Sequence, residues 1–562
     1  MKKMVLPIAL LLAICSLAGC SNNSSNPKQS EPADPLDLGE DFNAEYYPKK
    51  EDNKVAAIVG GNKMKFDIAL DFDGTEDGWQ ALADEYKRLS GGIVDVELIK
   101  QTTDMYIDKL RYEEENPKTD WDIVQGNLLN KASEHCENLA NVVRSQKNPY
   151  AGNKPWLDVL NKEAYITDVT GGTSYTFMLN SESLSTAWFV NTDTASKAGI
   201  TDFTPQTWDE LIEMLEKYQQ AGYKYPLGLA LNADSINNSQ FSWLLRIYGD
   251  YYFRQGYQYT STTFDSRTKI DSVFTYDKTL ENQEADSSFT FSYSRGFCLM
   301  MDDSCPYYMG ALSDLYKDFI YQFSRLGKYI RPSALNQSFS DVRTAFVQQN
   351  YEGGLESPQI MLDYTGKGLY FLNQDKLKNN IDFFDYPTIE SDYVEEGTLT
   401  RDVGGNGGYL ALFRHTRTEQ MELNKDFLKF VLSPYGQTIY YRALESSGKT
   451  PSGLTTVKND LVIIPESWKN FFQTDKITFT GLADSNKMLG LGGISFQSVS
   501  KVDMKSVSLW QGILRDQITI DTFADEWHSS IHSSWKEVAT EHNWKEDSWY
   551  YRNFSDPKYI VA

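Results

Sequence analysis

Residues 187–232 read AWFVNTDTASKAGITDFTPQTWDELIEMLEKYQQAGYKYPLGLALN, and this stretch decides the fold class. Its first four residues are apolar and predict a buried strand. A helix is expected to start after Thr207, because this side chain can cap the first turn while Glu210 completes a capping box. Apolar side chains then recur at helical spacing: Leu211, Ile212, Leu215 and Tyr218. Gly222 ends the helix and residues 226–230 return as a strand, which gives a strand–helix–strand unit.

The same alternation precedes this stretch. Strands are predicted at residues 65–70, 93–99 and 122–124, and helices at 78–89 and 105–115. Strands that alternate with helices favour a parallel sheet in an α/β protein. Ligands of such sheets bind at the carboxyl ends of the strands. The loops at residues 73–77 and 126–127 follow two of these strands, so we expect them to contact a ligand.

Three later segments are informative together with the first one. They are AFVQQNYEGGLESPQ at 345–359, GGNGGYLALF at 404–413 and KDFLKFVLSPYGQTIYYRALESSGKTP at 425–451. Together and in this order, the four segments resemble family 1 extracellular solute-binding proteins, the maltose-binding type that serves ABC importers. The resemblance covers about residues 65–527. It implies a two-lobe periplasmic-binding-protein-like fold with hinge crossovers and an interlobe ligand cleft.

The resemblance also implies how the chain is divided. Lobe 1 is expected to hold residues 59–180 and 405–455, lobe 2 residues 185–400 and 460–562, and an insertion in lobe 2 residues 251–294. Crossovers between the lobes are expected near residues 178–183, 401–405 and 451–456. The insertion alternates aromatic and polar residues, which is typical of extra strands or a long loop.

The function implied by the resemblance is capture of a carbohydrate, expected to be an oligosaccharide, for delivery to the permease subunits of an ABC transporter. Carboxylates and amides bind vicinal hydroxyls, and aromatic rings stack on sugar faces. The expected ligand-binding residues are Asp73, Thr75, Glu76, Asn127, Glu182, Ser183, Trp243, Glu356, Gln359, Asn406 and Asp503. Trp243 is the expected stacking residue, with core packing as the alternative. No catalytic residue, metal or cofactor is implied, and we expect a monomer.

The sequence departs from the family pattern at three positions. Gln349 and Glu352 replace small residues, and Gln359 stands where the family often has a stacking tryptophan. Because of these departures, the resemblance does not identify the sugar.

The N-terminus predicts an export signal. Lys2 and Lys3 precede a short apolar segment at residues 5–14, and small residues then precede Cys20. This segment is too short to span a bilayer. It resembles the lipobox of bacterial lipoproteins, which implies cleavage before Cys20 and lipidation of its thiol. The mature protein would then be anchored to the extracellular face of the bacterial cell membrane.

Residues 20–58 are predicted to form a flexible tether. They are rich in serine, asparagine, proline and charge, so they bury too little apolar surface to offset their ordering entropy. A partly ordered arm around Phe42, Tyr46 and Tyr47 is the alternative.

Composition excludes some classes of partner. The 562 residues include 78 acidic and 54 basic side chains, for a net charge of −24, which argues against nucleic-acid binding. Beyond Cys20 the cysteines are Cys136, Cys298 and Cys305, an odd number that does not indicate a disulfide framework. Pairing of Cys298 with Cys305 stays open.

Two enzyme classes compete with the binding-protein interpretation. Asp71-Phe72-Asp73-Gly74-Thr75 fits the DxDGT motif of the haloacid dehalogenase family, in which Asp71 would attack phosphorus and Asp73 would transfer protons. A cell-surface glycoside hydrolase would need only two suitably spaced carboxylates. The motif is short and therefore unspecific, and no hydrolase signature accompanies it.

Overall fold

The computed structural model describes residues 33–70, 74–100, 121–125, 135–161, 164, 168–170, 173–256, 263–265, 270–272, 299–300, 303, 307–364, 380–400, 405–451, 453–466, 468 and 500–541. The predicted helix at residues 105–115 and the residues Cys20, Asp71, Asp73, Asn127, Cys298 and Cys305 lie outside this part of the chain.

Lobe 1 is built on a six-stranded sheet. Its strands, in spatial order, are β16 (Leu454–Thr455), β8 (Leu179–Leu184), β15 (Gly405–Leu412), β3 (Ile123–Gln125), β1 (Met64–Leu70) and β2 (Val94–Lys100). β1 runs parallel to β2 and β3, which confirms the parallel arrangement predicted for this region, whereas β15 is antiparallel to β3 and β8. The described α-helices of this lobe are α1 (Val55–Ile58), α2 (Glu76–Leu89), α5 (Ala140–Ser145), α15 (Thr418–Val431) and α16 (Pro434–Ser446).

Lobe 2 has a four-stranded sheet with more helices around it. The strand order is β10 (Leu227–Gly228), β13 (Ile360–Tyr364), β9 (Thr186–Asn191) and β14 (Ile381–Phe384). The helices are α6 (Thr192–Lys197), α7 (Trp208–Gln220), α8 (Ala233–Asn237), α9 (Gln240–Phe253), α12 (Asp314–Ser324), α13 (Phe339–Gln348), α19 (Ser500–Leu514) and α20 (Ile520–Glu541). Short hairpins complete the described strands: β4 (Lys147–Asn148) with β5 (Lys154–Pro155), β6 (Asp168–Thr170) with β7 (Thr173–Tyr175), and β11 (Thr263–Asp265) with β12 (Ile270–Ser272).

The stretch at residues 187–232 folds largely as predicted. The side chain of Thr207 accepts a hydrogen bond from the backbone of Glu210, whose carboxylate accepts one from the backbone of Thr207, so the capping box starts α7. The buried face of α7 carries the four predicted apolar residues. The strand expected at residues 226–230 is shorter than predicted, because β10 has only two residues.

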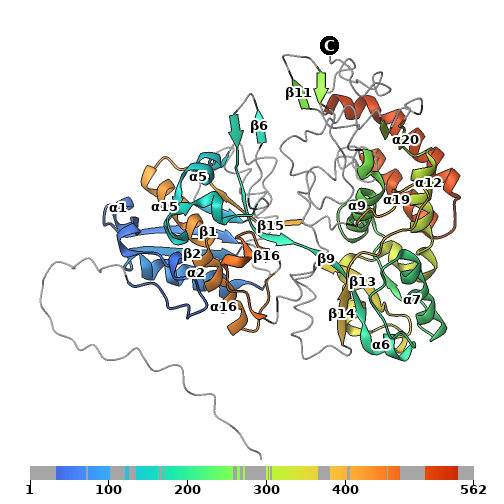
Figure 1. Ribbon diagram of the computed structural model, residues 1–562, viewed down its shortest axis with the longest axis horizontal. Coiled ribbons are helices and arrows are strands. Elements are labelled where there is room, and N and C mark those ends of the chain that lie inside the picture. The colour runs from blue at the N-terminus through green and yellow to red at the C-terminus, as the bar shows by residue number, and fades with distance from the viewer. Residues whose placement is uncertain are drawn as a thin grey trace, which may run out of the picture.

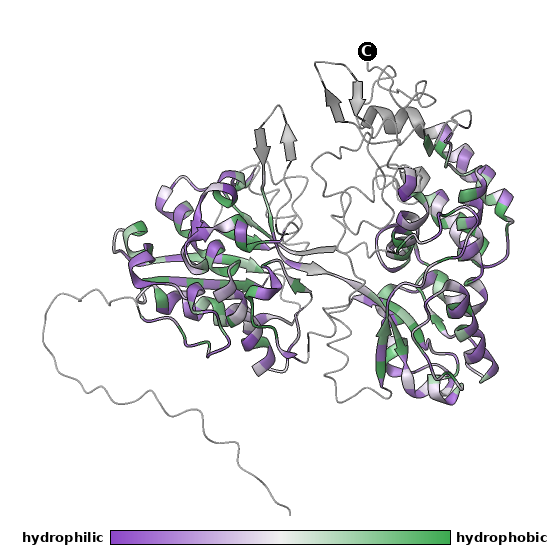
Figure 2. Ribbon diagram, viewed as in Figure 1, coloured by the Kyte–Doolittle hydropathy of each residue, from purple (hydrophilic) through white to green (hydrophobic). Residues whose placement is uncertain are grey.

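Two lobes are visible in Figure 1, with β9 and β15 running between them. Figure 2 shows apolar residues on the strands and on the helix faces that pack against them. One core cluster belongs to lobe 2, and a second centres on the lobe 1 sheet and continues onto Ala187 and Phe189 of β9. Only Ser185 separates β8 in one sheet from β9 in the other, so the first crossover is direct.

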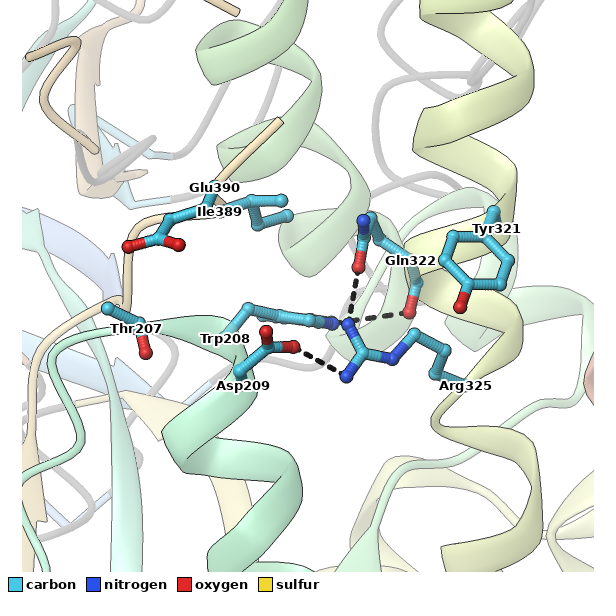
Figure 3. Close-up of a pocket in the computed structure, with 8 residues that line it drawn as sticks. All are labelled: Thr207, Trp208, Asp209, Tyr321, Gln322, Arg325, Ile389 and Glu390. Carbon is cyan, nitrogen blue, oxygen red and sulfur yellow. Dashed lines mark hydrogen bonds and ion pairs between the residues drawn. The ribbon is translucent and has the colours of Figure 1, made fainter. Parts of the chain in front are cut away.

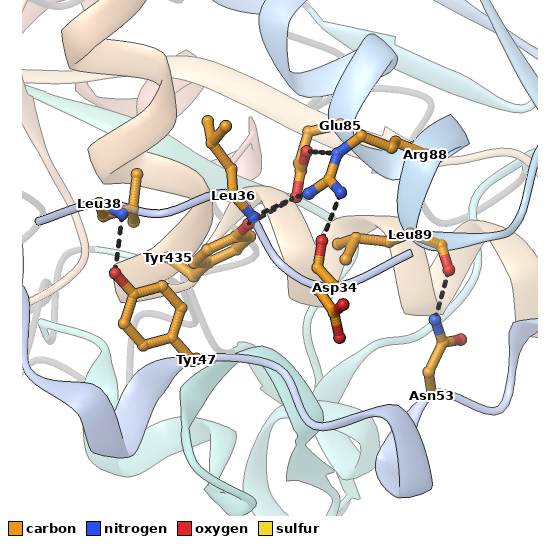
Figure 4. Close-up of polar contacts among 9 residues, drawn as sticks. All are labelled: Asp34, Leu36, Leu38, Tyr47, Asn53, Glu85, Arg88, Leu89 and Tyr435. Carbon is orange, nitrogen blue, oxygen red and sulfur yellow. Dashed lines mark hydrogen bonds and ion pairs between the residues drawn. The ribbon is translucent and has the colours of Figure 1, made fainter. Parts of the chain in front are cut away.

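Residues 33–58 do not form the predicted tether. Leu38, Phe42 and Tyr46 are 0%, 4% and 3% exposed and belong to the core cluster of lobe 1. Figure 4 shows how the segment is fixed: the backbone N–H of Leu36 donates to the hydroxyl of Tyr435 over 2.6 Å. The alternative of an ordered arm is therefore correct from Ala33 onward, because a few large apolar side chains outweigh the polar composition around them.

The third crossover also differs from the prediction. Val457, Ile464 and Trp468 still pack in the core cluster that centres on lobe 1, and the next described residues, in α19, pack in lobe 2. The chain therefore leaves lobe 1 after residue 468, not at residues 451–456, and lobe 2 does not begin at residue 460. The rest of the expected division into lobes remains a proposal.

In the part of the chain that the structure describes, no helix combines the length and the apolar character needed to cross a bilayer. Cys136 is buried. The described parts of the expected insertion are the end of α9, a helical turn up to Gly256 and the β11–β12 hairpin.

Candidate functional site

Three predicted ligand residues meet on the strands between the lobes. In the register of β8 and β15, Asn406 lies opposite Ser183, and Gly407 lies opposite Glu182. The short strand β16 flanks the other side of β8 and places Thr455 opposite Glu182. Residues that are far apart in the sequence are therefore neighbours on adjacent strands at the crossover.

Thr75 joins this group through a residue that the sequence did not reveal. The hydroxyl of Tyr440, on α16, donates to Glu182 Oε1 over 3.4 Å and also interacts with the side chain of Thr75. Burial, reinforced by the Glu182 carboxylate, raises the pKa of Tyr440 well above its usual value, so the hydroxyl keeps its proton. Tyr440 thus connects the end of the β1–α2 loop to a crossover strand.

A glycine allows Tyr440 to occupy this position. A Cβ atom on Gly78 would lie 2.5 Å from the Tyr440 ring, so only glycine leaves room for the ring against α2. The ring also meets Trp79 edge-on, with centroids 6.1 Å apart. Glu76, one residue after Thr75, faces outward and lies 3.9 Å from Lys100 at the end of β2.

On the lobe 2 side, Trp243 belongs to a cluster of three partly exposed rings. Its centroid is 5.3 Å from that of Phe339 and 4.8 Å from that of Tyr364. Tyr364 is the last residue of β13 and pairs with Thr186, the first residue of β9 after the crossover. The rings therefore lie at the end of the lobe 2 sheet that is nearest to lobe 1.

Exposed aromatic surface at this end is suited to a sugar face, because pyranose C–H groups pack on aromatic rings. Trp243 is partly buried against the lobe 2 core, so both expected roles, stacking and packing, remain compatible with its position. Phe339 and Tyr364 were missed by the sequence analysis, since only the fold brings α9, α13 and β13 together.

Two predicted ligand residues lie at the opposite end of the same sheet. Gln359 is fully buried, and its side-chain amide donates to Gln349 and to backbone carbonyls while its oxygen accepts from Asn191. Glu356 is 13% exposed and pairs with Lys224 and Arg331. β13 separates both residues from Tyr364 by a length of about 15 Å, so they lie away from the ring cluster, and their contact with a ligand stays a prediction.

The structure says less about the remaining predictions. Asp503 lies in the first turn of α19, a helix of lobe 2. Among the described residues, no group of three or more histidine, cysteine, aspartate or glutamate side chains could hold a metal ion.

A cavity of about 290 Å³ lies elsewhere on lobe 2, between the start of α7, α12 and the segment at Ile389 (Figure 3). Two of its charged groups pair with each other: Arg325 contacts Asp209 over 2.5 Å and also donates to Gln322 over 2.8 Å. None of the predicted ligand residues lines it.

Comparison with known proteins gives a family match. A family model described as bacterial extracellular solute-binding protein matches residues 81–470. A search of curated proteins gave no match.

Solved structures share the fold at low sequence identity. The apo form of RafE from Streptococcus pneumoniae is 13% identical, with a TM-score of 0.51 over 84% of this chain and 98% of its own. The cyclic alpha-maltosyl-1,6-maltose binding protein from Arthrobacter globiformis is 12% identical, with a TM-score of 0.50 over 85% and 100%. The bacterial solute receptor AcbH, titled for its preference for β-D-galactopyranose, is 13% identical, with a TM-score of 0.50 over 84% and 99%.

Proposed function

Because this chain belongs to the bacterial extracellular solute-binding proteins, we propose that it captures a carbohydrate between its two lobes and delivers it to an ABC importer. The observation that carries the proposal is the pair of clusters on either side of the crossover. On the lobe 1 side the buried Tyr440, in contact with Thr75, holds the partly exposed carboxylate of Glu182, and on the lobe 2 side Trp243 with Tyr364 offers aromatic faces. A pyranose binds polar groups through its hydroxyls and aromatic rings through its C–H faces, so the two clusters together suit a sugar.

The structural neighbours support a sugar as the ligand. The titles of two of them name a cyclic maltosyl-maltose and β-D-galactopyranose. For the present chain we propose an oligosaccharide, bound with micromolar or tighter affinity, about −8 kcal/mol or stronger. The site also includes the expected residues Asp73, Glu76, Asn127, Ser183, Asn406 and Asp503.

Capture by hinge closure requires that the ligand bind the closed form more strongly than the open form. The permease subunits would then recognise the closed form. We propose that the protein acts as a monomer without a cofactor and releases its sugar chemically unchanged, which sets it apart from the phosphatase and hydrolase alternatives.

We also propose that Cys20 carries the lipid, so that the protein works at the extracellular face of the cell membrane. In this arrangement the spacer between the lipid and lobe 1 ends near Ala33, because residues beyond it pack on lobe 1. Mass spectrometry of the membrane-extracted protein would detect the acyl chains on the residue-20 thiol, and an unmodified free N-terminus at another residue would contradict lipidation.

Calorimetry tests the ligand class. The chain from residue 21 is titrated with maltotriose, raffinose, mannobiose and galactose, and mass spectrometry identifies any sugar that co-purifies. We expect heat with at least one sugar, and a dissociation constant about tenfold higher in Trp243→Ala, because one stacked ring contributes roughly 0.5–1.5 kcal/mol beyond its buried area.

Tyr321→Ala is the matched control, since Tyr321 is also an exposed ring of lobe 2, 48% exposed, but lines the separate cavity of Figure 3. Equal loss in both variants would refute the proposed position of the site. Turnover of chromogenic phosphate or glycoside substrates would refute a pure binding role.

A further inference from the structure

A buried carboxylate lies directly behind the aromatic cluster of lobe 2. Asp363 on β13 is 0% exposed, and it accepts two hydrogen bonds of 2.7 Å from Nε and Nη2 of Arg343 on α13. Such two-pronged pairs are the strongest and most directional ion pairs in proteins. Because a buried charge without a partner is costly, Asp363 holds the guanidinium in one place.

The held guanidinium lies over two of the three rings. Its central carbon is 4.3 Å from the ring centroid of Phe339 and 5.7 Å from that of Tyr364. Phe339 and Arg343 are one helical turn apart on α13, so their side chains share a face. A guanidinium plane over an aromatic face is attracted by the ring quadrupole.

The same carboxylate also fixes the backbone of the next residue on β13, which carries one of the three rings. Oδ1 of Asp363 accepts the backbone N–H of Tyr364 over 2.8 Å. Trp243 meets both other rings, so its orientation depends on theirs. One carboxylate therefore orders a cation and, through it, rings from α9, α13 and β13.

We propose that Arg343 is a positioning residue of the ligand site: locked by Asp363, it holds Phe339, Tyr364 and Trp243 in their binding orientation before any sugar arrives. This inference rests on the proposed function, because it deepens the role of Trp243 in that site. Preorganisation removes the cost of ordering side chains on binding. Loss of the ion pair between Arg343 and Asp363 should therefore weaken sugar binding about tenfold, although Arg343 itself need not touch the sugar.

The test measures the orientation of Trp243 without a ligand. The chain from residue 21 is produced with 5-fluorotryptophan, and Trp243→Phe identifies the ¹⁹F resonance of Trp243. Arg343→Lys keeps the charge but loses the fork and the planar group. We expect the Trp243 resonance to broaden or split in this variant, while the other tryptophan resonances stay unchanged.

Arg331→Lys is the matched control. Arg331 also stacks on a tyrosine, 4.1 Å from the ring of Tyr351, and pairs with Glu356 over 3.1 Å, but at the other end of the sheet. It should leave the Trp243 resonance sharp. A sharp, unshifted Trp243 resonance in folded Arg343→Lys would overturn the proposal.

A double variant covers the case in which Arg343→Lys does not fold. Arg343→Gln with Asp363→Asn removes both charges together and so leaves no buried carboxylate unpaired. We expect the same broadening, and a Trp243 resonance like that of the parent would overturn the proposal. Raffinose and maltotriose are then titrated into the parent and the variants. If neither sugar nor any other glycan binds the parent, the proposed function fails, whereas the ¹⁹F result still decides the role of Arg343.

Discussion

Leu38→Ala tests whether the N-terminal segment is a working part of lobe 1. Leu38 is 0% exposed in the lobe 1 core, and its backbone N–H donates to the hydroxyl of Tyr47 over 2.7 Å. Replacing a buried leucine with alanine costs about 2–5 kcal/mol, as lost transfer energy and a residual cavity. Leu36, two residues earlier on the same segment, is 47% exposed and provides the control. Leu36→Ala should cost no more than about 0.5 kcal/mol.

Hydrogen exchange followed by mass spectrometry is the suitable assay, because two lobes need not unfold in one two-state transition. Peptides from α2 and α16 report on lobe 1, and peptides from α7 and α12 report on lobe 2. A loss of 2 kcal/mol corresponds to exchange about thirtyfold faster for amides that exchange through unfolding of lobe 1. We expect this acceleration in lobe 1 for Leu38→Ala alone, with lobe 2 unchanged.

Two results would refute the reasoning. If Leu38→Ala and Leu36→Ala had the same small effect, the segment would not contribute to the core. If both lobes lost protection equally, the segment would not belong to lobe 1 in particular.

Three further predictions follow from lobe 1. Gly78→Ala should lower the thermal midpoint of lobe 1 in calorimetry although alanine favours helices, because its Cβ would lie 2.5 Å from Tyr440; an unchanged midpoint would contradict the close packing. The hydrogen bond to Asp122, with Nε2 2.9 Å from the carboxylate, raises the pKa of His415 above 6.5. The contribution of His415 to stability is therefore complete below pH 6.5 and falls as the pH rises through the folded-state pKa. The urea midpoint of unfolding should accordingly change less between pH 6 and pH 9 in His415→Gln than in the parent protein. Burial raises the pKa of the Cys136 thiol to about 12, so in a background of Cys298→Ser and Cys305→Ser it should resist maleimide at pH 7 until urea unfolds lobe 1. Rapid labelling of that native variant would contradict the burial of Cys136.

Local patterns were predictable from the sequence. The capping box of Thr207 and Glu210 and the apolar face of α7 depend on residues within one or two helical turns, so the sequence contains all the information they need. The parallel pairing of β1 with its neighbours follows from the alternation of strands and helices.

The tether was predicted from composition, and the place of Gln359 was predicted from its position in a family pattern. Polar residues dominate the N-terminal segment, yet three apolar side chains, led by Leu38, suffice to fix it on lobe 1. Gln359 was placed in the site because of its position in a family pattern, whereas the direction of β13 puts it at the far end of the sheet.

The missed site residues required the fold. Tyr440 and Glu182 meet only because α16 packs on α2 beside β8. One sequence signal existed: a glycine inside the first turn of a predicted helix, Gly78, indicates that another part of the chain approaches closely. Phe339 and Arg343 are likewise one turn apart on α13, a spacing that places an arginine beside a ring.

The central claim is that two lobes close on a sugar, and a distance between the lobes tests it most directly. Spin labels are attached to Ser145→Cys, exposed on lobe 1, and Glu213→Cys, exposed on lobe 2. The background carries Cys136→Ala, Cys298→Ser and Cys305→Ser. Pulsed electron paramagnetic resonance then gives the distance with and without the sugar that produces the largest heat in calorimetry. The account predicts that this sugar shifts the distance distribution to a single new, narrower peak, whereas a distribution that stays the same with every sugar bound would contradict it.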